Sequence, residues 1–331
     1  MARRPVLVAP DSFKGTFTAP QVAAAIGRGL ESAGEPPPDL CPIADGGEGT
    51  LGVLLAALGG ETGGADVRDP LGRQVAAGFA LIEDGGTAIV EVAEASGLSR
   101  VADAERGPES AWEASSYGTG ELIAAAAATG AGVVIVAAGG SATTDGGSGA
   151  IEAIRDYGGL DGTKLVVLCD VRTTFERAAV VYGPQKGADP ATVKRLTARL
   201  DKLAKRLERD PRGMVMGGAA GGLAGGLWAA FGAQLVSGAV FVLDALDYDS
   251  RMRAAQAVIA GEGRLDDQTL QGKAAGEAAT RARQAGVPCH AIVGQDAMDL
   301  FGHRILDMQT VTPATTLDEI AEAAARLVPL L

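Results

Sequence analysis

Short apolar runs that lead into glycine-rich turns and then into helix-like segments recur at both ends of this 331-residue chain. The first run, "VLVAP", is followed by "TAPQVAAAIGRGLESAG", and similar units cover about residues 39–60, 255–286 and 288–327. Strands without polar alternation are typical of a parallel sheet that is covered by helices on both faces. We therefore expect an α/β domain built from both ends of the chain, residues 1–61 and 246–331.

The middle of the chain has a different pattern. Between Glu61 and Val92, short extended pieces are separated by the turn sequences "DPLGR" and "EDGG", which is typical of antiparallel strands. Two apolar strand candidates, "GVVIVAAGG" and "KLVVLCD", and a charged amphipathic helix follow. This pattern predicts an inserted, mixed α/β domain over residues 62–245. A cleft between two such domains is a usual place for a small-molecule site.

The charge balance and the cysteines restrict the expected partners and location. The net charge is −12, and nucleic-acid affinity depends mainly on Lys and Arg residues that neutralise phosphates, so no nucleic-acid partner is expected. Cys41, Cys169 and Cys289 form no C-x-x-C pair and lie beside apolar residues, as expected in a reducing compartment. The N-terminus lacks the apolar core of a signal peptide. These features predict a cytoplasmic protein.

Two uncharged spans, residues 122–144 and 214–243, raise the alternative of a membrane-associated dimer. In the second span, Gly217, Gly221 and Gly225 have the G-x-x-x-G spacing of paired membrane helices. Each glycine, however, costs a helix about 1 kcal/mol relative to alanine, and the first span ends in the polar sequence "GGSATT". We therefore favour a buried strand and a closely packed core helix, with no membrane partner.

Several apolar runs end in loops that are rich in glycine and polar residues. Because ligands of open α/β sheets bind beyond the carboxyl ends of the strands, these loops predict one shared site. Lys14, Lys186 and Lys273 lie next to glycines, where an ammonium group and backbone N–H groups can bind a phosphoryl group. Hydroxyl donors are available at Ser12, Ser141 and Thr143. Carboxylates that can bind Mg²⁺ or act as a general base belong to Asp45, Glu48, Asp145, Asp170, Glu262, Asp266 and Asp267.

The sequence "ADGGEGTLG" contains Gly47, Gly49 and Gly52 at the G-x-G-x-x-G spacing of dinucleotide-binding turns. Asp45 and Glu48 would repel a pyrophosphate there, so Mg²⁺ beside a phosphate, or a base directed at a hydroxyl group, is the better interpretation. The sequence contains neither a Walker A motif nor the H-R-D loop of protein kinases.

Taken in order, six of these loops resemble the motifs of the type I bacterial glycerate kinase family. They are "APDSFKGT" (9–16), "ADGGEGT" (44–50), "DPLGR" (69–73), "GGSATTDGGSG" (139–149), "GPQKGA" (183–188) and "GEGRLDDQTLQGK" (261–273). The resemblance covers most of the chain from Val6 to about Gly294 and implies a flavodoxin-like or Rossmann-like domain. It also implies phosphorylation of D-glycerate by ATP with Mg²⁺, and 2-phosphoglycerate is favoured over 3-phosphoglycerate as the product.

The resemblance implies a set of site residues, to which we assign roles from their chemistry. The candidate catalytic residues are Asp45, Lys14, Lys186 and Glu48, with Asp45 expected to accept or orient the proton of the substrate hydroxyl and Glu48 able to exchange roles with it. The expected substrate-binding residues are Ser12, Asp69, Arg73 and Arg264, because a guanidinium group matches a carboxylate in bidentate fashion. The expected nucleotide-binding residues are Ser141, Thr143, Asp145, Asp267 and Lys273, and the expected metal ligands are Asp170 and Glu262.

Two departures from the family pattern concern the possible site. After Val171 the chain reads Arg172-Thr173-Thr174-Phe175, where the family is expected to have Asn-Pro-Leu after a further acid. The segment between Gly149 and Leu165 is also shorter than expected, and either change could weaken nucleotide or metal binding. Two alternatives therefore stay open, a non-catalytic small-anion-binding protein derived from such a kinase and a kinase of another small hydroxy acid. A homodimer is compatible with the sequence.

Overall fold

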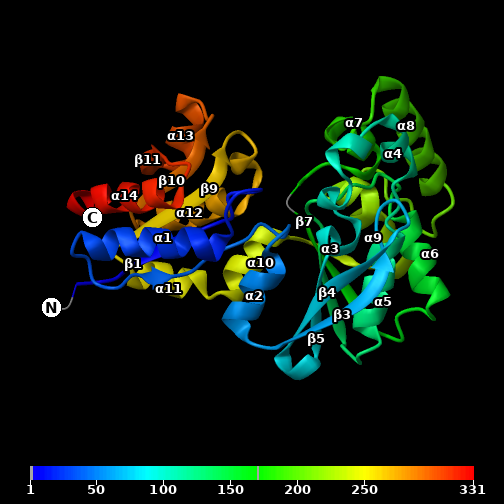
Figure 1. Ribbon diagram of the computed structural model, residues 1–331, viewed down its shortest axis with the longest axis horizontal. Helices are drawn as coiled ribbons and strands as arrows, with labels where there is room; N and C mark the ends of the chain where they lie inside the picture. Colours follow the sequence, from blue (N-terminus) through cyan, green and yellow to red (C-terminus); the bar gives the residue numbers. More distant parts are fainter. Residues whose placement is uncertain (1–2, 170) are drawn as a thin grey trace. The chain divides into compact units, whose positions relative to one another are not determined.

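The computed structural model describes residues 3–169 and 171–331, which divide into two compact units (Figure 1). The terminal unit contains the chain up to Asp45 and from Ala239 to the end, and the middle unit contains Gly46–Gly238. The predicted α/β class is confirmed, because one unit contains a parallel sheet and the other a mixed sheet, both with helices.

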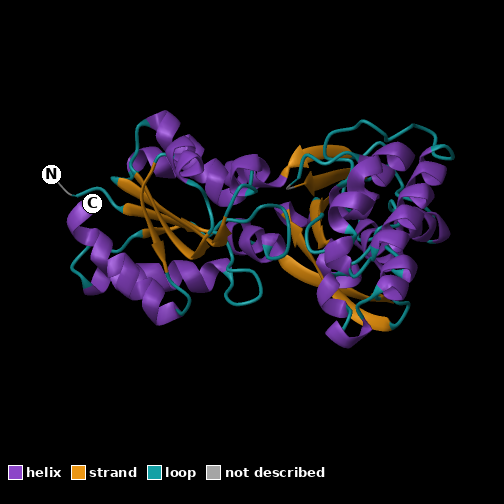
Figure 2. Cartoon of the chain, turned by 90° about the horizontal axis from the view of Figure 1, so that it is seen from above, coloured by secondary structure: helices purple, strands orange, loops and turns teal. Residues whose placement is uncertain are grey.

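The terminal unit has a five-stranded sheet in the order β11-β10-β9-β1-β2, and every pairing is parallel. Its strands are β1 (Val6–Pro10), β2 (Asp39–Leu40), β9 (Ala257–Leu265), β10 (Cys289–Asp296) and β11 (Met308–Pro313). Its helices are α1 (Ala19–Ser32), α10 (Gly238–Ala245), α11 (Tyr248–Ala254), α12 (Ala274–Ala285), α13 (Leu300–Leu306) and α14 (Leu317–Leu327). Figure 2 shows helices on both faces of this sheet, as the apolar strands predicted.

Local sequence signals explain where these elements begin. Thr18 caps α1 by accepting a hydrogen bond from the backbone N–H of Gln21, whose side chain accepts one in return from Thr18 N. Every residue of β1 is buried, and α1 packs against α14 over the same apolar cluster, which includes Val8, Ile26 and Ile320. Because every residue of β1 is buried, both faces of the strand are covered, and its carboxyl end delivers the loop "DSFKGT" to one edge of the sheet.

The middle unit has a six-stranded sheet in the order β3-β4-β5-β6-β7-β8. The strands are β3 (Glu61–Arg68), β4 (Gln74–Ile82), β5 (Thr87–Glu91), β6 (Val133–Ala137), β7 (Lys164–Cys169) and β8 (Gln234–Ser237). The helices are α2 (Thr50–Leu58), α3 (Val92–Ser96), α4 (Pro108–Glu113), α5 (Tyr117–Ala127), α6 (Ser148–Asp156), α7 (Ala178–Tyr182), α8 (Pro190–Ala204) and α9 (Leu223–Phe231). The antiparallel pairing expected between residues 61 and 92 is confirmed, and β5 to β8 pair in parallel.

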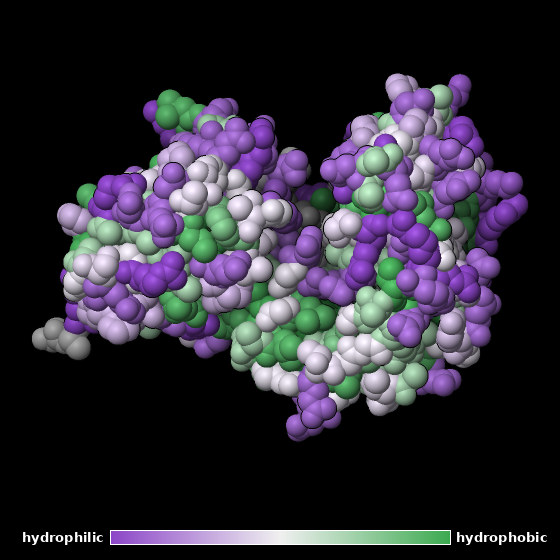
Figure 3. All heavy atoms as spheres, in the orientation of Figure 1, coloured by the Kyte–Doolittle hydropathy of each residue, from purple (hydrophilic) through white to green (hydrophobic). Residues whose placement is uncertain are grey.

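The surface carries few large apolar side chains. On α13, the exposed fractions of Leu300 and Phe301 are 70% and 71%. Figure 3 shows a small hydrophobic spot at this helix. Scattered apolar side chains of this kind are normal on globular domains.

The glycines of the second uncharged span pack inside the middle unit. A Cβ atom at Gly221 would lie 1.9 Å from the carbonyl oxygen of Thr143, and one at Gly225 would lie 2.7 Å from the ring of Phe175. The span is divided among a turn, α9, β8 and α10, and no helix among the described residues is long and apolar enough to cross a membrane. Gly221 therefore allows close backbone contact with the loop that contains Thr143, and Gly225 leaves room for the Phe175 ring.

Replacing Gly221 by alanine is expected to destabilise the middle unit strongly. Gly221 has φ of +67°, and the added methyl group would overlap the Thr143 carbonyl, so we expect a loss of about 3 kcal/mol or more in the free energy of unfolding. Gly213 is the matched control, because its φ is +76° but nothing lies within 4 Å of the position of its Cβ. Gly213→Ala should cost only about 1 kcal/mol. Equal losses in urea unfolding would show that backbone strain, not close packing, explains Gly221.

Candidate active site

A cavity of about 270 Å³ lies in the terminal unit, where the loops after β1 and β9 meet. It is lined by Asp11, Ser12, Phe13, Lys14, Thr16, Asp45, Glu262, Gly263, Arg264, Lys273, Gly294 and Thr315. Six residues assigned from the sequence, Ser12, Lys14, Asp45, Glu262, Arg264 and Lys273, therefore line one cavity. This is the edge at which open parallel sheets bind their ligands.

An ion pair between Lys14 and Asp45 lies in this cavity. The Lys14 Nζ donates a hydrogen bond to Asp45 Oδ2 at 2.8 Å. The Asp45 side chain is 2% exposed and that of Lys14 is 54% exposed, so the carboxylate is fixed while the ammonium group keeps access to solvent. Such a lysine can contact a ligand without leaving its carboxylate partner.

Asp11 is a cavity residue that the sequence reasoning did not select. It follows β1 directly, is 5% exposed, and its Oδ1 accepts a hydrogen bond from the backbone N–H of Ser12 at 2.6 Å. Burial, reinforced by the neighbouring Asp45 carboxylate, raises the pKa of Asp11 to about 8. Asp11 stands inside the quoted motif "APDSFKGT", but an aspartate after a strand is also an ordinary turn former, so the sequence alone did not separate the two roles.

Glu262 is the buried carboxylate that β9 contributes to the cavity. It is 5% exposed, and its Oε1 accepts a hydrogen bond from the Thr269 hydroxyl at 2.7 Å. Burial raises its pKa to about 7, although Thr269 and Lys273 act in the opposite direction. Arg264 is exposed and contacts Gln295 and Asp266.

Asp267 is exposed and is not among the residues that line this cavity. Asp170, predicted as a metal ligand, lies outside the described residues.

The donor set of the cavity suits Mg²⁺. Among the described residues, no group of three or more His, Cys, Asp or Glu side chains is arranged to hold a metal ion. Mg²⁺, however, is commonly bound through only one or two protein carboxylates, together with waters and substrate phosphates. The buried hard oxygens of Asp45 and Glu262 fit that pattern.

Lys186 lies in a second polar cluster, in the middle unit. It is 4% exposed, and its Nζ donates hydrogen bonds to Ser141 Oγ at 2.9 Å and to the carbonyl oxygen of Thr143 at 2.6 Å. Burial lowers the pKa of Lys186 to about 7, and the Asp145 carboxylate opposes this shift. The hydroxyl of Thr143 is buried without a hydrogen-bond partner among the described residues. A buried, incompletely satisfied polar cluster of this kind is typical of a binding site.

The Asp145 carboxylate closes the turn before α6. It accepts hydrogen bonds from the backbone N–H groups of Ser116, Gly147 and Gly149 and from the Ser116 hydroxyl. With four donors on two oxygens, this carboxylate is already satisfied inside the protein. Its position therefore supports the shape of the loop around Ser141 and Thr143.

The divergent segment after Val171 packs against the same loop. Phe175 is fully buried, and its ring would be 2.9 Å from a Cβ atom at Gly146 and 3.0 Å from one at Gly222. Phe175 therefore fills space that glycines on both sides leave open.

The G-x-G-x-x-G turn leads into α2, and a carboxylate already lies at this helix end. Glu91 is 5% exposed and its Oε1 accepts a hydrogen bond from the backbone N–H of Leu51 at 2.7 Å. Its carboxyl group occupies the place where a dinucleotide turn would receive a pyrophosphate. Glu48 lies nearby, since a Cβ atom at Gly140 would be 3.8 Å from its carboxylate. The arrangement disfavours dinucleotide binding at this turn.

The stability difference between the wild type and Glu91→Gln is expected to depend on pH. Burial raises the pKa of Glu91 from its ordinary value of 4.5 to about 7. Between these two values the folded state binds the proton more tightly than the unfolded state, so wild-type stability falls as the pH rises. From pH 4.5 to pH 8 the difference should change by about 2 to 3 kcal/mol in favour of the variant. Chemical unfolding at several pH values measures it. The exposed Glu322→Gln should show no such change, and a constant difference for Glu91→Gln would contradict the assignment.

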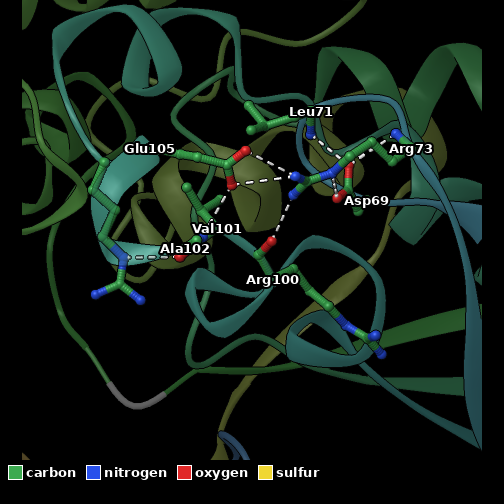
Figure 4. Close-up of polar contacts among 8 residues, drawn as sticks. Asp69, Leu71, Arg73, Arg100, Val101, Ala102 and Glu105 are labelled. Atoms are coloured by element: carbon green, nitrogen blue, oxygen red, sulfur yellow. Dashed lines mark hydrogen bonds and ion pairs between the residues drawn. The ribbon is translucent and has the colours of Figure 1, made fainter.

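Arg73 and Asp69 form a third cluster, also in the middle unit (Figure 4). The Arg73 guanidinium contacts Asp69 Oδ2 at 2.5 Å, Glu105 Oε1 at 3.0 Å and the carbonyl oxygen of Arg100 at 2.8 Å. Asp69 Oδ1 also accepts the backbone N–H groups of Leu71 and Arg73. These contacts hold the turn between β3 and β4.

The sequence and the fold both match known proteins. A family model described as the glycerate kinase family matches residues 6–155 and 157–329. The chain is 37% identical to a protein named glycerate kinase from Halalkalibacterium halodurans, over 95% of this chain and 92% of that protein. It is 35% identical to glycerate 2-kinase from Escherichia coli, over 96% of this chain and 93% of that protein. A crystal structure from Salmonella typhimurium, provisionally described as glycerate kinase 2, has a TM-score of 0.80 and 32% identity, covering 99% of this chain and 98% of that chain.

Proposed function

The chain belongs to the glycerate kinase family, and from this premise we propose that it transfers the γ-phosphoryl group of ATP to D-glycerate. The favoured product is 2-phosphoglycerate, consistent with the name of the Escherichia coli relative. The reaction takes place in the cytoplasm, where the three free, buried cysteines stay reduced.

The observation that carries this proposal is the composition of the terminal-unit cavity. Three cationic side chains, Lys14, Arg264 and Lys273, line it together with the buried carboxylates of Asp11, Asp45 and Glu262. Phosphoryl transfer demands positioning and neutralisation of charge more than a protein nucleophile, and this cavity supplies both signs of charge beside each other.

Five of the residues that line the cavity are assigned roles here. Lys14 binds the transferring phosphoryl group, since its ammonium group is half-exposed while Asp45 holds its position. Asp45 accepts or orients the proton of the glycerate hydroxyl. Arg264, whose side chain is exposed, clamps the glycerate carboxylate. The Ser12 hydroxyl donates a hydrogen bond to the same carboxylate. Lys273 binds a phosphate oxygen.

Mg²⁺ would be held by Glu262, and Asp45 offers a second buried carboxylate in the same cavity. Asp170, the other metal ligand expected from the sequence, lies outside the described residues. When bound, the ion neutralises charge on the phosphates of the nucleotide. Thr269 keeps the Glu262 carboxylate oriented through its hydroxyl donor.

The middle-unit site supports a role in binding phosphate oxygens of the nucleotide. Lys186 supplies an ammonium group, and Ser141 and Thr143 supply hydroxyl groups on a loop whose shape Asp145 maintains. Glu48 lies beside this loop and is the alternative to Asp45 as the base. Arg73 is fully engaged by Asp69, Glu105 and Arg100, so Arg264 is the better candidate for the carboxylate clamp.

Product identification tests this proposal. The purified protein is incubated with Mg²⁺ and ATP together with D-glycerate, L-glycerate or related hydroxy acids, and the products are assigned by phosphorus NMR. We expect 2-phosphoglycerate from D-glycerate and at least tenfold slower conversion of the other acids. A phosphorylated product from another acid alone would identify a different hydroxy-acid kinase. Binding of glycerate without any product would indicate a non-catalytic anion binder.

A further inference from the structure

We propose that Arg199 is a positioning residue that fixes the loop holding Lys186. Arg199 lies on α8, far in sequence from this loop, and no motif in the sequence points to it. The inference rests on the proposed role of Lys186 and its loop in phosphoryl transfer.

The Arg199 guanidinium connects two separate segments. Its Nη2 donates a hydrogen bond to the carbonyl oxygen of Thr144 and its Nη1 donates one to the carbonyl oxygen of Trp112, both at 2.7 Å. The guanidinium also lies over the Trp112 ring, 4.7 Å from its centre. A planar group that stacks on a ring and donates to two carbonyls has little freedom to move.

The contact with Thr144 adjoins the contact that holds Lys186. The Thr143 carbonyl accepts from Lys186 and the Thr144 carbonyl accepts from Arg199, so the two cations bind successive carbonyls of one loop. Only the φ and ψ angles of Thr144 separate these carbonyls, and fixing one restricts the other. Thr144 is 1% exposed. If Arg199 were removed, the buried carbonyl oxygen of Thr144 would lose the hydrogen bond that Arg199 donates to it, which is unfavourable.

Arg199 also carries an unsatisfied group. Its Nε is buried without a hydrogen-bond partner among the described residues. Buried donors are nearly always satisfied in folded proteins, and exceptions tend to mark places where function constrains the geometry.

Arg195 provides a matched control on the same helix. It lies one turn before Arg199 and its guanidinium is 4.1 Å from the centre of the same Trp112 ring. Its side chain is exposed, and no hydrogen bond joins it to the loop of Thr143 among the described residues. Arg195 therefore shares the cation–π contact with Arg199 and lacks the link to the loop.

Steady-state kinetics of Arg199→Met, Arg199→Lys and Arg195→Met test the inference. We expect kcat to fall about 100-fold in Arg199→Met while KM for D-glycerate stays within threefold, because the glycerate clamp lies in the terminal unit. Arg199→Lys should recover less than a tenth of the loss, since one ammonium group cannot replace a fork on two carbonyls. Arg195→Met should stay within twofold of the wild type. If Arg199→Met does not fold, kcat and KM of Arg199→Lys are compared with those of Arg195→Met instead.

Two outcomes would overturn the inference. One is a kcat for Arg199→Met within threefold of the wild type, and the other is an equal loss in Arg195→Met. A crystal structure of the Arg199 variant gives a readout that does not depend on the reaction, and it should show the hydrogen bond between Lys186 and the Thr143 carbonyl broken. An intact hydrogen bond would show the inference about Arg199 to be wrong, whether or not the wild type is active. A wild type that is inactive with D-glycerate would count against the proposed function alone.

Discussion

Replacing Lys186 by methionine is expected to reduce kcat about 1,000-fold and, at the same time, to stabilise the folded protein. Loss of one charge-stabilising donor lowers kcat by about 100- to 1,000-fold, and we expect the upper end because Lys186 is buried. The gain in stability follows from burial, which lowers the pKa of Lys186 from 10.5 to about 7. Between these values the unfolded state binds the proton more tightly, so the wild type gains stability as the pH rises from 7 to 10.5. The methionine side chain has no such cost.

The advantage of Lys186→Met should therefore depend on pH. Near pH 6 we expect the variant to be more stable by about 2 to 3 kcal/mol, after allowing for two lost hydrogen bonds. The difference should cross zero near about pH 9, and the wild type should be more stable by about 1 kcal/mol near pH 10. Thermal and urea unfolding at several pH values measure it. Lys205→Met is the control, because Lys205 is exposed and forms an ion pair with Asp201. This variant should leave kcat unchanged and should change the free energy of unfolding by no more than about 0.5 kcal/mol. A variant that is less stable than the wild type at pH 6 would mean that Lys186 serves the fold.

Asp45→Asn is the second substitution with a large expected effect on turnover. An amide cannot accept the hydroxyl proton, so kcat should fall about 1,000-fold, within the usual range for loss of a general base. Lys14 would lose its carboxylate partner, but because the lysine is half-exposed the free energy of unfolding should fall by only about 1 kcal/mol. Steady-state rates and urea unfolding of the same preparation separate the two effects.

A surface aspartate provides the control for Asp45. Asp201 also forms ion pairs, with Lys205 and Arg212, but its side chain is 44% exposed and lies outside the cavity. Asp201→Asn should keep kcat within twofold of the wild type. If Asp45→Asn also stayed within threefold, Asp45 would lose its proposed role, and Glu48→Gln would become the variant to examine for the base.

Much of the fold could be predicted because its signals are local. The apolar runs that became β1, β6 and β7 and the capped helix α1 depend on neighbouring residues, as do the antiparallel hairpins between residues 61 and 92. Ligand sites at the carboxyl ends of parallel strands follow from topology, so the sequence also indicated that Lys14, Asp45 and Glu262 would meet.

The contacts that the sequence did not reveal connect residues that are far apart in the chain. Glu91 lies opposite the α2 terminus forty residues away, and Arg199 reaches a loop fifty-five residues away. Neither residue stands in a motif, and a charged residue on a strand end or helix has many ordinary roles. The glycines at 217, 221 and 225 raised the alternative of a membrane helix, although a packed core helix was favoured, because spacing alone does not tell which surface they contact. In the structure that surface is the loop of Thr143 and the ring of Phe175.

The rate of ADP formation by the purified wild-type chain with Mg²⁺ and ATP, measured with and without D-glycerate, tests the central claim most directly. We predict a saturable increase with D-glycerate to at least about 100-fold above the background hydrolysis of ATP. An ADP rate that D-glycerate does not change would contradict the claim that this chain phosphorylates glycerate.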